Sequence, residues 1–207
     1  QRLSRGLGDV YKRQIEISEN NYEEQLRSSI VKNIELTNIG PSVMSGRVTD
    51  LEVNPNNPTE FYVAYASGGL WHTKNNGTTF SPIMDNSMTQ NIGDFAIDWK
   101  SNSIYVGTGE SNSSRSSYPG IGIIKSNDNG STWSNIGLRD SHHISRVLVN
   151  PNNENHLVVA VIGHLYTKNT QRGIFTSFDN GKTWEKSLFI NDHTCLLYTS
   201  PSPRDNR

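Results

Sequence analysis

Short apolar stretches separated by polar turns run through most of the chain. Apolar and polar residues alternate in 47–53 (RVTDLEV), and β-branched residues dominate 157–162 (LVVAVI), both of which are typical of strands. Asn-Pro and Asn-Gly pairs, which are typical of turns, fall between such stretches. The sequence therefore predicts an all-β protein, and only 15–33 has room for a helical turn.

One eight-residue stretch, which we call the octet, occurs three times at a spacing of about fifty residues. It reads SNDNGSTW at 126–133 and SFDNGKTW at 177–184, and a degenerate copy, TKNNGTTF, occupies 73–80. A second repeat, VNPNNP at 53–58 and VNPNNE at 149–154, precedes two of the copies. Units of this length with four short strands each are typical of β-propeller blades.

Alignment of the repeats divides the chain into three units. We expect blade 1 at 45–83, blade 2 at 84–137 and blade 3 at 138–194, preceded by a lead-in at 15–44 with an outer strand. The predicted fold is an incomplete β-propeller of about three four-stranded antiparallel blades. Because three blades do not close a ring, we expect the remaining blades of a longer chain as partners.

The two ends of the sequence do not continue this pattern. Residues 1–14 and 195–207 resemble translated adapter-derived ends that recur on unrelated metagenomic gene fragments, and we expect them to be artefacts. The only cysteine, Cys195, belongs to the second of these ends, so we expect neither a disulfide framework nor thiol chemistry.

The charge of the chain argues against a nucleic-acid partner. The formal net charge is −1, and without the two ends thirteen basic residues face eighteen acidic ones. Nucleic-acid binding depends on neutralising phosphates with basic side chains, so we expect no nucleic acid. No apolar run approaches the roughly eighteen residues that a membrane span needs, so we expect no span.

The octet predicts a self-closed hairpin between the third and fourth strands of each blade. Its Asn-Gly pair demands positive φ, the acid before it accepts hydrogen bonds from the turn, and the final aromatic ring is buried against a neighbouring strand or blade. In the first copy Asn75 replaces the acid. The structural residues predicted in this way are Gly77, Phe80, Asp128, Gly130, Trp133, Asp179, Gly181 and Trp184.

The pattern S-x-D-x-G-x-T-W resembles the Asp-box, or BNR, motif of sialidase-like and sortilin-like propellers. Longer stretches, among them NIGPSVMSGRV, VGTGESNSSRSS and GHLYTKNTQRGIFTSFDNGKTW, are similar to the N-terminal blades of large secreted bacterial proteins labelled glycosyl hydrolase-like or sortilin-like. The resemblance covers nearly all of 15–194 and implies an extracellular or cell-surface propeller. It does not choose between an enzyme and a binding protein.

The repeats diverge most in the loops that propellers commonly use to bind ligands. These are 109–120 (GESNSSRSSYPG), 163–172 (GHLYTKNTQR) and the link that ends in Ser141-His142-His143. Each of these loops also has a purely structural interpretation. The first can be a solvated loop in which Arg115 pairs with Glu110, and the two histidines can be hydrogen-bonded caps at the start of a strand. The candidate ligand-binding residues are Asn112, Arg115, Tyr118, His142, His143, His164 and Arg172.

Two further groups of residues carry candidate chemistry. A zinc site at His142 and His143 needs a third ligand, which His164 can supply, but the spacing does not demand it, and we predict no metal or cofactor. Asp50, Asp94 and Arg146 occupy equivalent repeat positions on the first strands. We expect them to form a charge ring lining the propeller channel or a structural ion-pair network.

The sequence alone does not decide whether the protein is an enzyme or a binding module. Glycoside hydrolysis normally needs two carboxylates flanking the scissile bond, and Glu110 is the one obvious candidate in the divergent loops. Xyloglucanase-type propellers carry an acid just before a Gly-Gly pair, where this chain has Ser67. We therefore predict a ligand-binding or scaffold module for glycan or peptide. The alternative is part of a propeller glycoside hydrolase acting on polysaccharide, with Glu110 as its acid or base.

Overall fold

The computed structural model describes residues 24–25, 27–29, 33, 46–112 and 117–194. The chain divides into two compact units, Gln1–Ser42 and Val43–Arg207. In the first unit Glu24, Gln25, Arg27 and Ser28 are helical, inside the segment predicted to hold a helical turn. The predicted outer strand of the lead-in and the ends 1–14 and 195–207 lie outside the described residues.

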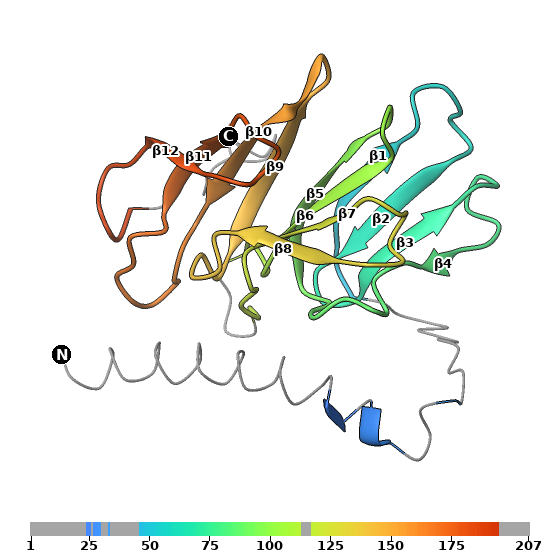
Figure 1. Ribbon diagram of the computed structural model, residues 1–207, viewed down its shortest axis with the longest axis horizontal. Coiled ribbons are helices and arrows are strands. Elements are labelled where there is room, and N and C mark those ends of the chain that lie inside the picture. Colours follow the sequence, from blue (N-terminus) through green and yellow to red (C-terminus); the bar gives the residue numbers. More distant parts are fainter. Residues whose placement is uncertain (1–23, 26, 30–32, 34–45, 113–116, 195–207) are drawn as a thin grey trace, which may run out of the picture. The chain divides into compact units, whose positions relative to one another are not determined.

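The second unit contains three four-stranded antiparallel sheets, which confirms the predicted all-β architecture (Figure 1). Blade 1 consists of β1 (Val48–Val53), β2 (Phe61–Tyr65), β3 (Gly69–Thr73) and β4 (Ser81–Pro82). Blade 2 consists of β5 (Ile92–Asp98), β6 (Ser103–Thr108), β7 (Ile123–Ser126) and β8 (Ser134–Gly137). Blade 3 consists of β9 (Ile144–Asn150), β10 (Asn153–Val161), β11 (Gly173–Ser177) and β12 (Glu185–Leu188).

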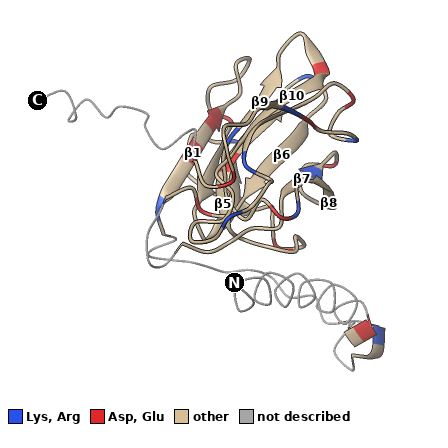
Figure 2. Ribbon diagram, turned by 90° about the vertical axis from the view of Figure 1, so that its left-hand side faces the viewer, with Lys and Arg blue, Asp and Glu red and all other residues tan. Residues whose placement is uncertain are grey.

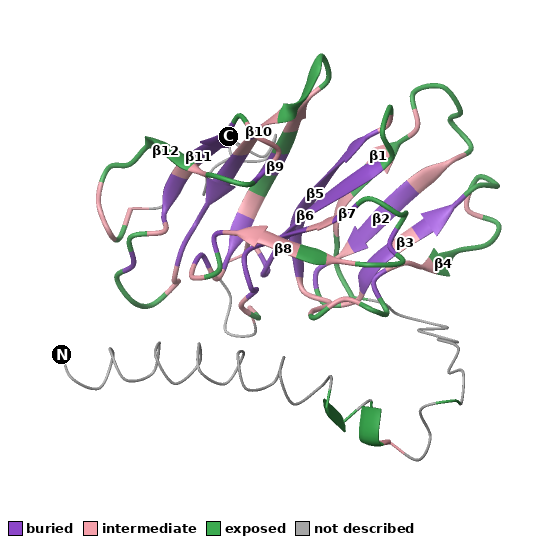
Figure 3. Cartoon of the chain, viewed as in Figure 1, coloured by how far each residue is buried: buried purple, intermediate pink, exposed green. Residues whose placement is uncertain are grey.

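The first strands of the three blades, β1, β5 and β9, lie next to one another, with blade 2 between the other two (Figure 1). Every residue of β5 and β6 is buried, because a sheet covers each face of blade 2 (Figure 3). The last strands, β4, β8 and β12, contain no buried residue, and neither does β1 at the other side of blade 1. Tyr105, Ile144, Val159 and Phe175 belong to the apolar core between blades 2 and 3.

Side chains of the octet close each hairpin. In blade 2 the hydroxyl of Ser126 accepts the N–H of Gly130 at 2.8 Å and donates to Asp128 Oδ1 at 2.8 Å. The Asp128 carboxylate accepts the backbone N–H and the hydroxyl of Thr132 at 2.8 and 2.6 Å. These hydrogen bonds, those from Thr132 first, lower the pKa of Asp128. The serine at the start of the octet therefore closes the turn together with the acid, whereas the sequence analysis attributed this closure to the acid alone.

The other two octets form the same bonds. In blade 3 the Asp179 carboxylate accepts the backbone N–H and the hydroxyl of Thr183, which lower the pKa of Asp179 to about 2. In blade 1 Asn75 Oδ1 accepts the N–H of Thr79 at 2.9 Å, and Asn75 Nδ2 donates to the Thr79 hydroxyl at 2.9 Å. An amide can therefore replace the carboxylate without loss of the turn.

The tryptophan that ends the octet reaches the preceding blade. The indole N–H of Trp133 donates to the carbonyl of Ile83 at 3.1 Å, and that of Trp184 donates to the carbonyl of Ile136 at 2.8 Å. Ile83 follows β4 of blade 1, and Ile136 lies in β8 of blade 2. The second and third octets thus each satisfy a carbonyl at the outer edge of the preceding blade.

A tyrosine of the preceding blade forms a second bond to the octet. The hydroxyl of Tyr62 in β2 donates to Asn129 Oδ1 at 2.5 Å, and that of Tyr105 in β6 donates to Asn180 Oδ1 at 2.9 Å. Burial raises the pKa of Tyr62 to about 12, so this hydroxyl keeps its proton. Asn129 and Asn180 therefore both adopt positive φ and accept a bond from the preceding blade.

Phe80 differs from the two tryptophans, and the predicted burial of its ring against a neighbouring strand or blade is wrong. Its ring is 41% exposed, and it contacts Phe61 of its own blade edge-on, with ring centroids 6.0 Å apart. The described residues contain no sheet on that side of blade 1, so the ring has no neighbouring blade against which to be buried.

The three equivalent charged residues of the first strands do meet. Asp94 accepts the N–H of Val147 at 2.7 Å and lies 3.3 Å from Arg146 Nη1, and its side chain hydrogen-bonds Asp50. Burial raises the pKa of Asp94 to about 8, against the hydrogen bond from Val147, which lowers it. The three residues therefore form a hydrogen-bonded cluster that links the first strands of all three blades.

Lys and Arg residues are interspersed with Asp and Glu along the blades (Figure 2). Within the described part of the chain, no helix has the length and apolar character needed to cross a membrane.

Because the octet of blade 2 contacts the preceding blade, we expect two similar Gly→Ala substitutions to lower the free energy of unfolding by different amounts. Gly130 and Gly77 share a turn position and have φ of +88° and +80°. A Cβ at Gly130 would lie 2.4 Å from the Ile83 carbonyl oxygen, whereas at Gly77 the nearest atom is Phe61 Cζ at 3.5 Å. Gly77→Ala should cost about 1–2 kcal/mol for positive φ alone, and Gly130→Ala about 1–3 kcal/mol more.

Urea unfolding followed by tryptophan fluorescence measures both free energies of unfolding. Equal losses in the two variants would contradict the close approach of the second octet to blade 1.

Candidate functional site

The octets and the Asn/Pro turns lie at the same end of the blades. The backbone N–H of Asn76 donates to the carbonyl of Thr59 at 2.8 Å, and that of Asn180 donates to the carbonyl of Asn155 at 3.0 Å. Because the strands are antiparallel, the loops between second and third strands and between blades lie at the other end. This is the end where the repeats diverge in sequence.

Three loops meet at that end, and their described residues, which we call the loop face, are 109–112 with 117–122, 138–143 and 163–172. The N–H of Gly120 donates to the carbonyl of His142 at 2.6 Å, and Asn169 Nδ2 donates to the carbonyl of Asp140 at 2.7 Å. The link between blades 2 and 3 is therefore held from both sides.

Gly109 shows how closely the first two segments approach. Its φ is +87°, and a Cβ there would lie 1.9 Å from the carbonyl oxygen of His142. Only glycine fits this position, so the backbone at the start of the divergent loop of blade 2 packs directly against the backbone of the link between blades 2 and 3.

Glu110 is tied to blade 1. Its side chain is 7% exposed, and Arg47 Nη2 lies 3.3 Å from Glu110 Oε2 and donates to Asn112 Oδ1 at 2.9 Å. The sequence did not single out Arg47 as this partner, although it lies one residue before β1. Arg115, the partner considered from the sequence, lies outside the described residues.

His143 and Arg172 point inward rather than to the surface. His143 is 3% exposed, and its Nδ1 lies 2.8 Å from the carbonyl oxygen of Glu110. Burial lowers its pKa, which favours the neutral ring. Arg172 is 4% exposed and donates to the carbonyl of His164. Both side chains hold the loop face together and are not placed to meet a ligand directly.

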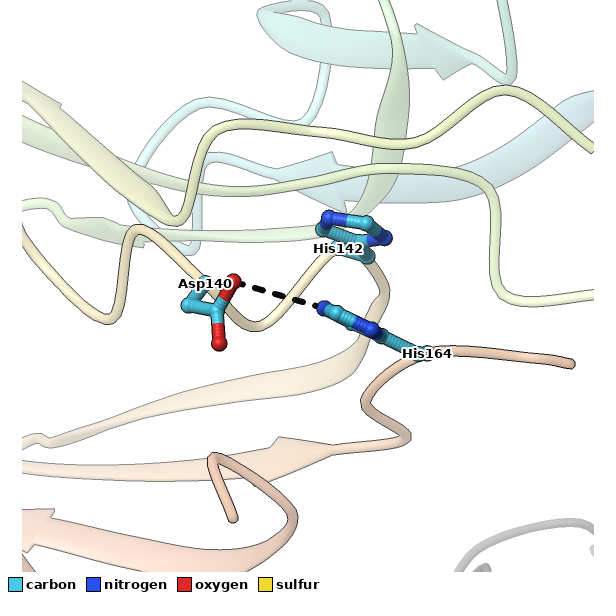
Figure 4. Close-up of side chains that lie close together, drawn as sticks. All are labelled: Asp140, His142 and His164. Atoms are coloured by element: carbon cyan, nitrogen blue, oxygen red, sulfur yellow. Dashed lines mark ion pairs between the residues drawn. The ribbon is translucent and has the colours of Figure 1, made fainter. Parts of the chain in front are cut away.

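His142 and His164 come together with an acid that the sequence analysis did not single out, Asp140 (Figure 4). His164 Nε2 lies 3.4 Å from Asp140 Oδ1, and the two imidazole rings stack with centroids 3.6 Å apart. One ligand atom from each residue lies within 4.8 Å of the others. The sequence feature that could have identified Asp140 is its position two residues before His142 in the divergent link.

Burial, with a further contribution from His164, lowers the pKa of His142 to about 4. The His142 ring is therefore neutral near pH 7, the form in which imidazole binds metals and accepts hydrogen bonds.

Ser141 Oγ, His164 Nε2 and Asn169 Oδ1 are among the buried polar atoms of the loop face that have no hydrogen-bond partner among the described residues. Such an atom typically costs about 1–3 kcal/mol, and ordered water, an ion or a ligand commonly satisfies it. Two large rings on the same face are exposed, Tyr118 at 54% and Tyr166 at 78%. The loop face thus combines unsatisfied polar atoms with exposed aromatic surface.

No protein-family model and no curated protein matches this sequence. Among solved structures, an ancestral GH74 enzyme matches with a TM-score of 0.59 and 21% identity, over 77% of this chain and 20% of that chain. The GH74 enzyme of Niastella koreensis matches with a TM-score of 0.49 and 23% identity, over 65% of this chain and 20% of that one. YCF48 from Cyanidioschyzon merolae matches with a TM-score of 0.44 and 17% identity, over 70% and 38%.

The likeness to the ancestral GH74 enzyme shows the fold of the chain, a β-propeller built from antiparallel blades. The chain spans about a fifth of the length of the two GH74 structures.

The unsatisfied hydroxyl on the loop face predicts an unusual response to mutation. Ser141 is 0% exposed and its hydroxyl has no hydrogen-bond partner among the described residues, whereas the equally buried Ser126, 1% exposed, bonds Gly130 and Asp128. Without added ions or ligands, Ser141→Ala should leave the free energy of unfolding unchanged or raise it by up to about 1 kcal/mol, and Ser126→Ala should lower it by about 1–2 kcal/mol.

Chemical denaturation of the two variants beside the wild type measures this difference. A loss in Ser141→Ala as large as that in Ser126→Ala would show that the Ser141 hydroxyl is satisfied within the chain.

Proposed function

We propose that the chain is part of an extracellular or cell-surface Asp-box propeller that acts as a ligand-binding or scaffold module. The loop face is its binding surface, and a glycan or a peptide is its ligand. The observation that carries the proposal is the presence of unsatisfied buried polar atoms and two exposed tyrosine rings on the same loop face.

The chemistry of the loop face suits such ligands. Tyrosine rings offer an apolar face with a polar tip, which is why tyrosine is common at interfaces. His164 Nε2 and Asn169 Oδ1 lack hydrogen bonds within the described residues. The apolar parts of a sugar or peptide can cover the tyrosine rings, and an ordered water can bridge a ligand hydroxyl or amide to these buried atoms.

Binding without turnover agrees best with the acidic residues present. Hydrolysis of a glycoside normally needs two carboxylates flanking the bond. The carboxylate of Glu110 is buried and engaged by Arg47, and Ser67 stands where xyloglucanase-type propellers carry an acid. The alternative, part of a propeller glycoside hydrolase that uses Glu110 as acid or base, requires Glu110 to be released from Arg47.

The proposal predicts binding that depends on the tyrosines of the loop face. Affinity electrophoresis through gels containing xyloglucan, xylan or pullulan, and selection from a displayed peptide library, should each be run with the chain. We expect retention by at least one probe, and a loss of affinity of about tenfold or more in Tyr118→Ala/Tyr166→Ala.

Phe178→Ala is the matched control, because Phe178 is 62% exposed but belongs to the octet of blade 3 at the opposite end. Failure to bind any probe, or an equal loss in the control, would overturn the proposal. Release of reducing ends that disappears in Glu110→Gln would establish the hydrolase alternative in its place.

A further inference from the structure

The cluster of Asp140, His142 and His164 offers two imidazoles and one carboxylate (Figure 4). Nitrogen and oxygen donors of this kind are the common zinc ligands, and three protein ligands with one open position are typical of zinc sites that also bind water or a ligand. We infer that these three side chains form a binding site for a divalent ion of the zinc class. The inference goes beyond the proposed function, and metal binding is measurable without any glycan or peptide.

The distance between Asp140 and His164 fits a shared ion better than a direct bond. His164 Nε2 lies 3.4 Å from Asp140 Oδ1 and forms no hydrogen bond. A charge-assisted N–H···O bond closes to about 2.8 Å. Two ligands of one tetrahedral zinc ion, each about 2.0–2.1 Å from the metal, lie roughly 3.3–3.4 Å apart. The observed separation therefore corresponds to one edge of a tetrahedral site.

Neighbouring groups orient the ligands, as they do in established metal sites. His164 Nδ1 lies 2.8 Å from Thr167 Oγ1, so a hydrogen bond on this side leaves Nε2 facing Asp140. The backbone N–H of Asp140 donates to Gln171 Oε1 at 2.9 Å. Arg172 donates to the carbonyl of His164. Segments 138–143 and 163–172 are thus cross-linked before any ion binds.

His142 is the ligand that has to adjust. Its ring stacks on His164 with 21° between the ring planes, whereas an ion lies in the plane of each imidazole that binds it. Because the three ligand atoms already lie within 4.8 Å of one another, side-chain rotation suffices to aim a nitrogen at the ion. The Asp140 side chain is 42% exposed, so the open coordination position faces solvent on that side.

Zinc titration of the full chain tests the inference. After treatment with a chelator and its removal, isothermal titration with zinc chloride should show one ion per chain. His164→Gln, His142→Gln and Asp140→Asn should each weaken zinc binding by about tenfold or more. Cobalt(II) bound in place of zinc should give the visible absorption bands of a tetrahedral ion, and these bands should weaken in the same variants.

Two controls separate this site from other ligands of the chain. His156→Gln removes a histidine outside the cluster, and Cys195→Ser/His193→Gln removes the only thiol and a nearby histidine. Both variants should bind zinc as the wild type does. Circular dichroism checks each variant, and Asp140→Asn, which preserves side-chain shape, carries the test if a histidine variant fails to fold.

Absence of stoichiometric binding would overturn the inference, and so would unchanged affinity in His142→Gln and His164→Gln or loss of binding in either control. None of these outcomes bears on the glycan or peptide proposal, because the titration contains neither probe.

Discussion

The bonds between each octet and the preceding blade are the interaction on which the described structure depends. A blade alone buries only part of its apolar surface, so adjacent blades must keep a fixed register for the core between them to form. Trp133 and Tyr62 supply two directional bonds between blades 1 and 2, and Trp184 and Tyr105 repeat them between blades 2 and 3. The hairpin that closes a blade therefore also attaches that blade to the preceding one, which accounts for the repetition of a whole octet rather than of a glycine turn alone.

How much of the fold could be predicted depends on how far apart in the sequence the interacting residues lie. The strands and the Asn-Gly reversals were predictable because alternation and turn chemistry are local properties of the sequence. The bonds of Tyr62 and Tyr105 were not, because each joins residues more than sixty positions apart in different blades. The incorrect expectation for Phe80 has the same origin, since an octet does not reveal whether a neighbouring blade adjoins it.

The candidate site shows the same division. Divergence between repeats singled out these loops as candidates, and His142 and His164 do lie together. Residue type and spacing do not separate them from His143 and Arg172, whose side chains turn inward to bind backbone carbonyls. Asp140 was missed because it became a neighbour of His164 only through the folding of two segments against each other. Ligand-binding potential on this face is thus a property of the assembled loops rather than of any one motif.

A double-mutant cycle between Tyr62 and Asn129 tests the central role of the octet bonds most directly. Tyr62→Phe removes the donor, and Asn129→Gly removes the acceptor while tolerating the positive φ of 57° at that position. Free energies of unfolding for the wild type, both single variants and the double variant should give a coupling energy of about 0.5–1.5 kcal/mol. A coupling energy of zero would contradict the account, because the two residues would then contribute to stability independently.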